Sequence, residues 1–502
     1  MIWSKLQKAF LSALVLIMPA ILQAKDATVK RVEFEKTSSN DFMKWSPIGE
    51  KGVIFASKED DKQKGAEKKH EIWTITKLDT MLNGIGSVDV SMETGCVKKW
   101  FEADGNFYMI NTNFGASKKS QQKYVIHILD CDKMTTKEYE GTVDKYFPTW
   151  EEPMVLGDYL YMLGKAYFAK PFMLITNIKT GESNLIEIET QENKNYIMIS
   201  NQADKENNEI QVLIKEKNKK SGDITKLHTF SGLKKTGEIT FDLKGDNKYP
   251  ASAFVTKNKD GNYLISGTYK LDENGSNSWA AGIFVIKADS NGKTQFSTFT
   301  NFLDLKNFTS YMSDRDQKKT EDKKAKAEAK GKELTKECRI LPYRVIEDND
   351  KYILAGESYR EVYKPKTDKN GMSYNVFDGY IYTHYFLAEY DKDGKIEWSN
   401  AAELHVKSSY SLKQHLSINK NTDALQIIYP SYKSIYNTSY DANGEEISSE
   451  EIEYVKDEEY LKAVYENETW YWYGNTFLST DRMKIKDDKG KRKVFSVGKI
   501  SF

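Results

Sequence analysis

A unit of short strands separated by glycine turns recurs along the chain, and this repetition limits the possible folds more than any other feature. The clearest copy has hydrophobic strands at residues 263–269 and 282–289, then an Asn-Gly turn and a further strand at 294–299. A second copy spans residues 352–398 and matches the first at a strand glycine, an aspartate and a turn glycine: Gly267 with Gly356, Asp289 with Asp391, and Gly292 with Gly394. Runs of β-branched and aromatic residues bounded by such turns are typical of strands in antiparallel sheets.

Weaker copies extend the pattern in both directions. They begin near residues 52, 104, 157 and 209 before the two clear copies, and near 424 and 470 after them. Most neighbours start about fifty residues apart, a period typical of one four-stranded blade per unit. The sequence therefore predicts an all-β fold, a single β-propeller of eight blades over residues 25–502. Seven blades with one irregular unit is the alternative, because the fourth and seventh copies lack the strand glycine.

The N- and C-terminal strands are expected to close this ring. The last unit has candidate strands at 470–474 and 494–502, with no later sequence to supply its outermost strand. Residues 29–35 precede the first unit, and there Val32 and Phe34 alternate with charged neighbours as in a half-exposed strand. Pairing of 29–35 with 494–502 would cover an exposed sheet edge.

Charged stretches interrupt the period and are expected at the rim, at residues 58–71, 215–220 and 314–337. In the last of these, opposite charges stand four residues apart, as in Asp314 and Lys318, which favours a solvated helix. Leu334 is its one large apolar residue, so the segment has no apolar stripe with which to dock. We expect a surface arm, and an arm that binds a partner is the alternative.

The first 24 residues are predicted to be a secretory signal peptide. Lys5 and Lys8 precede an uncharged apolar stretch from 9 to 22, and Ala24 ends a small-residue cleavage site. Pro19 lies within the stretch and would be costly in the middle of a buried helix. We expect cleavage before Lys25 and an exported mature protein, either periplasmic or secreted.

The charge balance indicates no particular partner. Lys+Arg and Asp+Glu both number 74, whereas nucleic-acid binding usually shows as a strong basic excess on one face. Beyond the N-terminal stretch, no apolar run approaches the roughly 18 residues that a spanning helix needs. We therefore expect no nucleic-acid partner and no membrane span.

Candidate chemical sites are few. The three cysteines allow at most one disulfide, and the six histidines show no zinc-binding spacing. Turns that start at Asp289, Asp391 and Asp441 lack a full series of calcium ligands and fit plain turns. Nucleophile, phosphate and dinucleotide motifs are absent from the sequence. No catalytic residue, binding residue, metal ligand or cofactor is assigned.

Three aromatic residues, Trp100, Trp150 and Tyr343, fall just before predicted second strands. On segments that line the central channel, such rings would stack on a sugar or a peptide. Burial between blades is the interpretation we favour, because aromatic residues are common in cores and strands.

The repeated unit resembles that of secreted bacterial propeller-like proteins. The resemblance rests on the Tyr-Leu-x-x-Gly strand at 263–267, the hydrophobic strand that ends in Asp289, and the turn at Gly292. The unit is similar only in part to quinoprotein repeats, which place a Trp after the blade turn, as Trp398 is placed here. The resemblance implies a propeller fold and export, but no particular reaction.

Two classes of function are consistent with such a ring. The first, which we favour, is an exported binding or scaffold module that takes a protein, peptide or glycan ligand at one face of the ring, where propeller loops gather. The alternative is a polysaccharide hydrolase or lyase with acids in the central channel. An enzyme needs titratable groups that converge in a pocket, whereas aromatic and neutral polar groups suffice for a binder.

Overall fold

The computed structural model of the protein is almost entirely β. It describes residues 28–35, 43–58, 70–94, 97–112, 122–143, 149–165, 170–190, 196–217, 223–348, 351–369, 371–404, 406, 412–420, 424–431, 434–453, 460–463, 468–488 and 490–502. Within these ranges there are 36 strands, one short 3₁₀ helix, η1 (Phe302–Asp304), and one α-helix, α1 (Asp314–Glu328). The signal peptide predicted for residues 1–24 lies outside the described residues.

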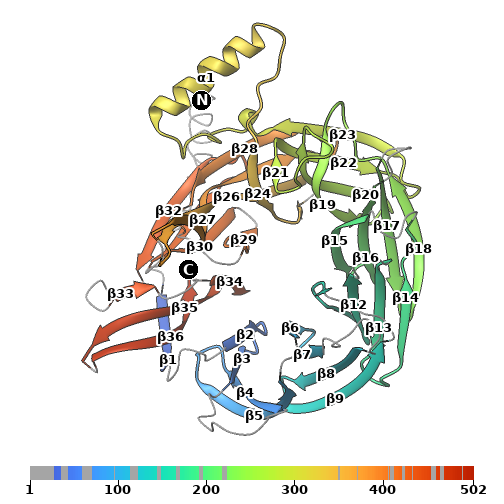
Figure 1. Cartoon of the computed structure of the whole chain (residues 1–502), viewed down its shortest axis with the longest axis vertical. Helices are drawn as coiled ribbons and strands as arrows, with labels where there is room; N and C mark the ends of the chain where they lie inside the picture. Colours follow the sequence, from blue (N-terminus) through green and yellow to red (C-terminus); the bar gives the residue numbers. More distant parts are fainter. Residues whose placement is uncertain are drawn as a thin grey trace, which may run out of the picture.

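The strands form eight antiparallel sheets arranged around a central axis (Figure 1). We number the sheets in chain order. Sheet 1 contains β2 (Met43–Pro47), β3 (Val53–Lys58), β4 (His70–Leu78) and β5 (Gly84–Glu93); sheet 2 contains β6 (Val97–Ala103), β7 (Asn106–Thr112), β8 (Gln122–Asp130) and β9 (Thr135–Val143). Sheet 3 contains β10 (Thr149–Trp150), β11 (Met154–Leu156), β12 (Tyr159–Lys165), β13 (Phe172–Asn177) and β14 (Ser183–Glu187); sheet 4 contains β15 (Tyr196–Asp204), β16 (Glu209–Glu216), β17 (Ile224–Ser231) and β18 (Lys234–Phe241).

The second half of the chain repeats this plan with additions. Sheet 5 contains β19 (Tyr249–Lys257), β20 (Tyr263–Lys270), β22 (Gly282–Ala288) and β23 (Thr294–Asn301); sheet 6 contains β21 (Trp279–Ala280), β24 (Cys338–Pro342), β25 (Ile346–Asp348), β26 (Lys351–Thr367), β27 (Ser373–Tyr390) and β28 (Ile396–Glu403). Sheet 7 contains β29 (Ser417–Lys420), β30 (Leu425–Ser431), β31 (Ser434–Tyr440) and β32 (Glu446–Glu453); sheet 8 contains β33 (Tyr460–Ala463), β34 (Glu468–Tyr473), β35 (Thr476–Asp487), β36 (Gly490–Ser501) and β1 (Thr28–Glu35). The all-β propeller architecture predicted from the repeats is confirmed.

Burial changes from the middle to the outside of each sheet, and the sequence pattern follows it. In sheet 5 every residue of the second strand, β20, is buried, because neighbouring sheets cover both of its faces. In the outermost strand of sheet 4, β18, partly buried residues alternate with exposed ones, as expected for a strand with one face in water. The hydrophobic runs recognised in the sequence are therefore mostly second and third strands.

Hydrophobic clusters between consecutive sheets hold the ring together. One of them joins sheets 8 and 1, where Phe55 and Leu78 pack with Trp472 and Phe495. The indole nitrogen of Trp472 also donates to the carbonyl oxygen of Gly52 at 3.0 Å. The last sheet thus packs on the first as other sheets pack on their neighbours, with apolar burial as the main stabilising force.

Terminal strands close the ring as predicted. β1 pairs antiparallel with β36 along its whole length, from Thr28 opposite Ser501 to Glu35 opposite Val494. Sheet 8 also holds β35, for which the sequence pattern predicted no strand, and residues 470–474 contribute to its innermost strand, β34.

The predicted insertions are confirmed in part. The segment 314–337 contains the expected helix, α1, which has no buried residue and lies outside the ring (Figure 1). The boundaries at 215–220 are wrong, because Lys215 and Glu216 are buried at the end of β16 and Lys215 forms a 2.8 Å ion pair with Asp223. At 58–71, only Lys58, His70 and Glu71 are described, and they belong to β3 and β4.

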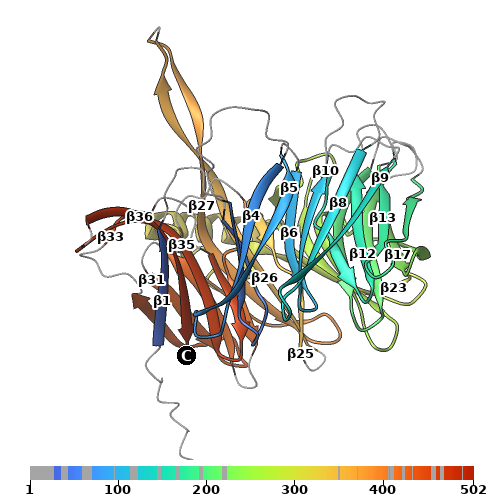
Figure 2. The same cartoon turned by 90° about the horizontal axis from the view of Figure 1, so that it is seen from below.

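A larger insertion was missed. Strands β26 and β27, of 17 and 18 residues, continue beyond sheet 6 as a two-stranded hairpin that projects from the ring (Figure 2). The copy of the repeat predicted over residues 352–398 did not include this extension. We refer to residues 360–380 as the projecting hairpin.

The one α-helix of the described ranges, α1, has neither the length nor the apolar composition of a membrane-spanning helix.

Candidate functional site

A cleft opens at one end of the ring between sheets 4, 5 and 6. Because consecutive strands are antiparallel, the turns from first to second strand and from third to fourth strand all lie at this end. The cleft has a volume of about 820 Å³ and is bordered by the ends of β15, β19 and β25, by β22 and β26, and by the turn that follows β27. We refer to it as the turn-face cleft, and its charged lining residues are Asp204, Lys205, Glu206, Lys257, Lys259, Asp260, Lys287, Arg344, Glu347 and Lys392.

Cations exceed anions in this lining by six to four. Two of the lysines have partners: Lys205 reaches Asp104 at 2.9 Å across the mouth of the ring, and Lys257 lies 3.8 Å from Glu209. The other three, Lys259, Lys287 and Lys392, form no ion pair with any described residue. Lys287 attracts the Asp260 carboxylate without a close ion pair, so the turn-face cleft presents lysine charge free of close ion pairs within a concave surface.

Two of the acids are held by their own turns. Asp204 accepts hydrogen bonds from the backbone and side chain of Asn207, at 3.0 and 2.8 Å. Asp260 accepts from the backbone and side chain of Asn262, at 3.2 and 2.7 Å, and the backbone hydrogen bond is the main reason that its pKa is lowered. These carboxylates shape the turns at the edge of the cleft.

Arg344 connects the turn-face cleft to the interior of the ring. It follows β24, and its guanidinium donates to the carbonyl oxygen of Asn201 in β15 at 3.2 Å. Desolvation by the surrounding protein lowers its pKa. Arg344 also lines a second cavity of about 360 Å³, together with Phe254, Tyr343, Ile346, Gln414 and Ile418. We refer to this space as the channel cavity.

Polar contacts continue along the inner strands. The amide of Asn201 donates to the carbonyl oxygen of Glu152 at 3.2 Å, and the Glu152 carboxylate pairs with Lys99 at 2.5 Å. With the Arg344 contact, this series links sheets 2, 3, 4 and 6 around the axis. The inner wall is thus fixed by hydrogen bonds between sheets that are not all neighbours.

The three aromatic residues singled out in the sequence have different environments. Trp150 is 7% exposed and lies edge-on to Phe172, so its predicted burial is confirmed. Trp100 is half-buried and packs on Trp73, with 4.6 Å between ring centroids. Tyr343 lines the channel cavity, but it is also partly buried and packs against the hydrophobic cluster between sheets 6 and 7.

Tyr343 belongs to a buried polar network that sequence reasoning missed. Its hydroxyl donates to Glu357 in β26, and the same carboxylate oxygen accepts from the backbone amides of His415 and Leu416 at 2.7 and 2.8 Å. The Glu357 side chain is fully buried, and its second oxygen has no hydrogen-bond partner among the described residues. Burial raises the pKa of Glu357 to about 7. The sequence signal that could have revealed this network is an acidic residue, Glu357, within the hydrophobic run 352–359.

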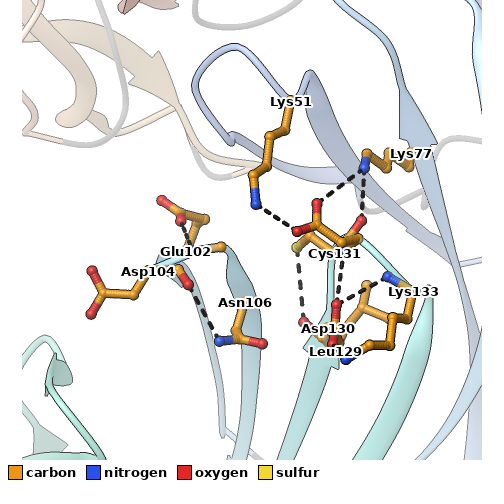
Figure 3. Close-up of polar contacts among 11 residues, drawn as sticks. Lys51, Lys77, Glu102, Asp104, Asn106, Leu129, Asp130, Cys131 and Lys133 are labelled. Carbon is orange, nitrogen blue, oxygen red and sulfur yellow. Dashed lines mark hydrogen bonds and ion pairs between the residues drawn. The ribbon is translucent and has the colours of Figure 1, made fainter.

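On the other side of the mouth, sheets 1 and 2 carry a set of charges that are mutually paired (Figure 3). Lys51 reaches Asp132 at 2.5 Å, and Lys77 donates to the carbonyl oxygen of Cys131 at 2.8 Å. Lys133 lies 2.9 Å from Asp130, and its hydrogen bonds lower the pKa of that carboxyl to about 2. These contacts stabilise turns and leave less free charge than the turn-face cleft presents.

In the Asp-rich turns, the first aspartate is used in hydrogen bonds within its own turn. Each first aspartate accepts two backbone N–H bonds from its own turn, as Asp289 does from Asn291 and Lys293, both at 2.9 Å. Asp391 and Asp441 do the same. These hydrogen bonds are those of plain turns, and the described residues contain no cluster of three or more potential metal ligands. Cys131 and Cys338 are buried free thiols.

Comparison with known proteins places the chain in no family. No family model and no curated protein matches it. Among solved structures it is similar to the polysaccharide lyase Uly1, with 8% identity over 80% of this chain and 89% of that chain and a TM-score of 0.36. It is also similar to prolyl oligopeptidase B from Galerina marginata, with 9% identity over 88% of this chain and 56% of that chain and a TM-score of 0.39. A third match is the AfRom2 CNH domain, with 9% identity over 79% of this chain and 91% of that chain and a TM-score of 0.31.

Proposed function

We propose that the protein is a binding module that takes an acidic ligand in the turn-face cleft. The supporting observation is that Lys259, Lys287 and Lys392, which have no ion-pair partner among the described residues, line one cleft of about 820 Å³ with Arg344. Carboxylate and sulfate groups complement such lysines, and an arginine adds paired donors in a fixed geometry. The ligand is an acidic glycan or an acidic peptide segment, bound on a rigid ring whose inner wall is already ordered.

Two acids of the turn-face cleft, Asp204 and Asp260, are engaged in hydrogen bonds within their own turns. Asp204 and Asp260 accept hydrogen bonds from their own turns, and the lowered pKa of Asp260 keeps it ionised near neutral pH. A general acid must hold a proton near the working pH. Asp260 is therefore poorly suited to act as a general acid, and both carboxylates shape the turns at the edge of the cleft.

The test is a binding titration with polygalacturonate, poly-L-glutamate and neutral dextran. The variant Lys259→Ala/Lys287→Ala/Lys392→Ala should weaken binding of the acidic polymer by about tenfold or more, and the remaining binding should depend less on salt. The matched control is Lys318→Ala/Lys323→Ala/Lys330→Ala, which removes the same charge from exposed positions on and just after α1. Equal losses in both variants, or no binding of either acidic polymer, would contradict the proposal.

A polysaccharide hydrolase or lyase is the second candidate, and a separate observation favours it. Glu357, with a pKa of about 7, accepts a hydrogen bond from Tyr343, which lines the channel cavity beside Arg344. A carboxyl group of that pKa can exchange a proton near neutral pH. Release of shorter chains from polygalacturonate, abolished in both Tyr343→Phe and Glu357→Gln, would favour this candidate over binding alone.

We also propose that the protein acts outside the cytoplasm, after removal of residues 1–24. The support is the sequence pattern of Lys5, Lys8, an apolar stretch and Ala24. Intact-mass measurement on the periplasmic and secreted fractions should give a chain that begins at Lys25. A chain in those fractions that retains Met1 would contradict export by cleavage.

A further inference from the structure

A strip of exposed aromatic and charged side chains lies at the end of the ring opposite the turn-face cleft. It starts at Trp279 in β21, at the edge of sheet 6, and runs onto the projecting hairpin. Trp279 is opposite Arg339 in β24, and Arg339 is opposite Tyr359 in β26. Residues directly opposite share a sheet face, as do residues two apart in one strand. Glu361 and Tyr363 therefore continue the same face as Trp279 and Arg339.

Each member of the strip contacts the next one. The Arg339 guanidinium lies over the Trp279 ring, 5.1 Å from its centroid, and forms an ion pair with Glu361. The hydroxyl of Tyr363 donates to Glu361 at 2.7 Å. Phe377 in β27 supports Tyr363 edge-on, with centroids 5.8 Å apart. Trp279 is nevertheless 41% exposed and Tyr363 52% exposed, so both rings are held in place with much of their surface in solvent.

The loop beside Trp279 forms a pocket with a fixed wall. The pocket has a volume of about 240 Å³ and is lined by Trp279, Asp272, Ser276 and Glu337, among others. Lys270 is 3% exposed, and its ammonium group donates to Gly275 and, at 2.8 Å, to the side chain of Asn277. A buried cation that bonds to two points of one loop orders that loop. The strip thus has an ordered pocket at one end.

This combination matches the chemistry of a sugar chain. A sugar ring offers an apolar C–H face to an aromatic ring and hydroxyl groups to polar side chains at its edge. The Arg339–Glu361 pair supplies donors and acceptors with no net charge, so it does not select for an acidic or a basic ligand. Rings already held by neighbouring side chains lose little rotamer freedom on binding.

We propose that Trp279, Arg339, Glu361 and Tyr363 form a binding strip for a neutral oligosaccharide. It is separate from the turn-face cleft and lies at the opposite end of sheet 6. Two exposed aromatic rings separated by an ion pair would stack on different sugar units of one chain, and the pocket beside Trp279 would receive one unit.

The test is a panel of immobilised neutral oligosaccharides, namely cello-, xylo-, manno-, laminari- and chitohexaose, followed by titration of the best binder. Trp279→Ala and Tyr363→Ala should each weaken binding by about tenfold, and Trp279→Phe should restore part of it. The matched control is Tyr374→Ala. Tyr374 is 48% exposed on the same hairpin, but it lies opposite Lys366, three residues from Tyr363 and so on the other face. Its loss should change affinity by less than about twofold.

Three outcomes would contradict the proposal of a binding strip. These are no binding to any member of the panel, unchanged binding in Trp279→Ala and Tyr363→Ala, or an equal loss in Tyr374→Ala, which would indicate that the whole hairpin docks on a protein or a lipid surface. The Lys259→Ala/Lys287→Ala/Lys392→Ala variant should bind the neutral chain normally. The two sites can therefore fail independently.

Discussion

Glu357 is an acid that the fold keeps largely protonated below neutral pH, and this has a measurable effect on stability. Its pKa rises from 4.5 to about 7 in the folded state because the side chain is buried. Between these values, the unfolded chain loses the proton while the folded chain keeps it. Stability from this group is therefore fully present below pH 4.5 and falls as pH rises towards 7.

Replacement of Glu357 by Gln should remove this dependence. Gln can still accept the bonds from Tyr343, His415 and Leu416 through its carbonyl oxygen, and it carries no charge. Relative to the parent, the variant should gain up to roughly 3 kcal/mol of unfolding free energy between pH 4.5 and 7, because the pKa of Glu357 rises from 4.5 to about 7 on folding. Denaturant titrations at several pH values measure this difference. A constant difference between the two proteins would show that Glu357 has an ordinary pKa.

Gly267, one of the glycines that align the two clearest repeats, has a steric role. A Cβ atom there would lie 2.1 Å from the carbonyl oxygen of Ser252 on the neighbouring strand. Gly267→Ala should therefore destabilise the protein by about 1–3 kcal/mol or more, because backbone would have to move. Gly84→Ala is the control, since a Cβ atom there would have no heavy atom within 4 Å. Equal melting temperatures for both variants would contradict this account.

At the scale of elements, α1 is attached to the ring mainly through the segments on either side of it. The helix buries none of its residues, and Lys324 makes its contacts with the ring, to the carbonyl of Leu303 at 2.8 Å and to Asp304 at 2.7 Å. Before the helix, Tyr311 stacks on the buried His384 with ring centroids 4.1 Å apart.

Replacement of residues 314–330 by a short Gly-Ser linker should thus change stability by less than about 1 kcal/mol. Tyr311→Ala removes the stacking partner of His384 and should cost more, although it alters a single residue. Thermal melts of the two proteins decide the matter. A large fall in melting temperature on removal of the helix would show that α1 itself docks on the ring.

Strands were predictable from sequence where burial imposes a continuous apolar run, and less so elsewhere. β20 and β30 are buried throughout and were recognised. β35 was missed because its sequence, Thr476–Asp487, mixes apolar residues with Asp, Arg and Lys. The projecting hairpin was missed for the same reason, since most of residues 363–375 face solvent and show no apolar alternation. Lys215 was assigned to a loop because a buried lysine cannot be distinguished from an exposed one until its partner, Asp223, is known.

At the scale of the whole molecule, closure of the ring rests on two short segments. Removal of residues 25–35 or, separately, of 494–502 would leave the strand that paired with the removed segment without hydrogen bonds along one edge. It would also expose Phe55 and Leu78 of the cluster between sheets 8 and 1. We expect aggregation or a loss of roughly several kcal/mol in either case. Soluble truncated proteins that melt like the parent would contradict closure by these strands.

The candidate sites could not be predicted, because each one is assembled across sheets. Lys259 and Lys392 are separated by more than a hundred residues and meet at the turn-face cleft only because sheets 5 and 6 are neighbours in the ring. Trp279 and Tyr363 share a face only through the register of β21, β24 and β26. The turns were predictable from local chemistry, whereas their grouping around a shared space depends on tertiary structure.

Pairing of β1 with β36 also has a consequence for biosynthesis. β1 is the first described strand that a ribosome makes, and its partner ends at residue 501. Sheet 8 therefore cannot be completed until the residues up to about 501 have been translated and, if the protein is exported, have crossed the membrane. Until then β1 presents an unpaired edge of the kind that chaperones shield from aggregation. A product that stops before residue 490 lacks this partner altogether, which makes incomplete chains a natural target for proteases.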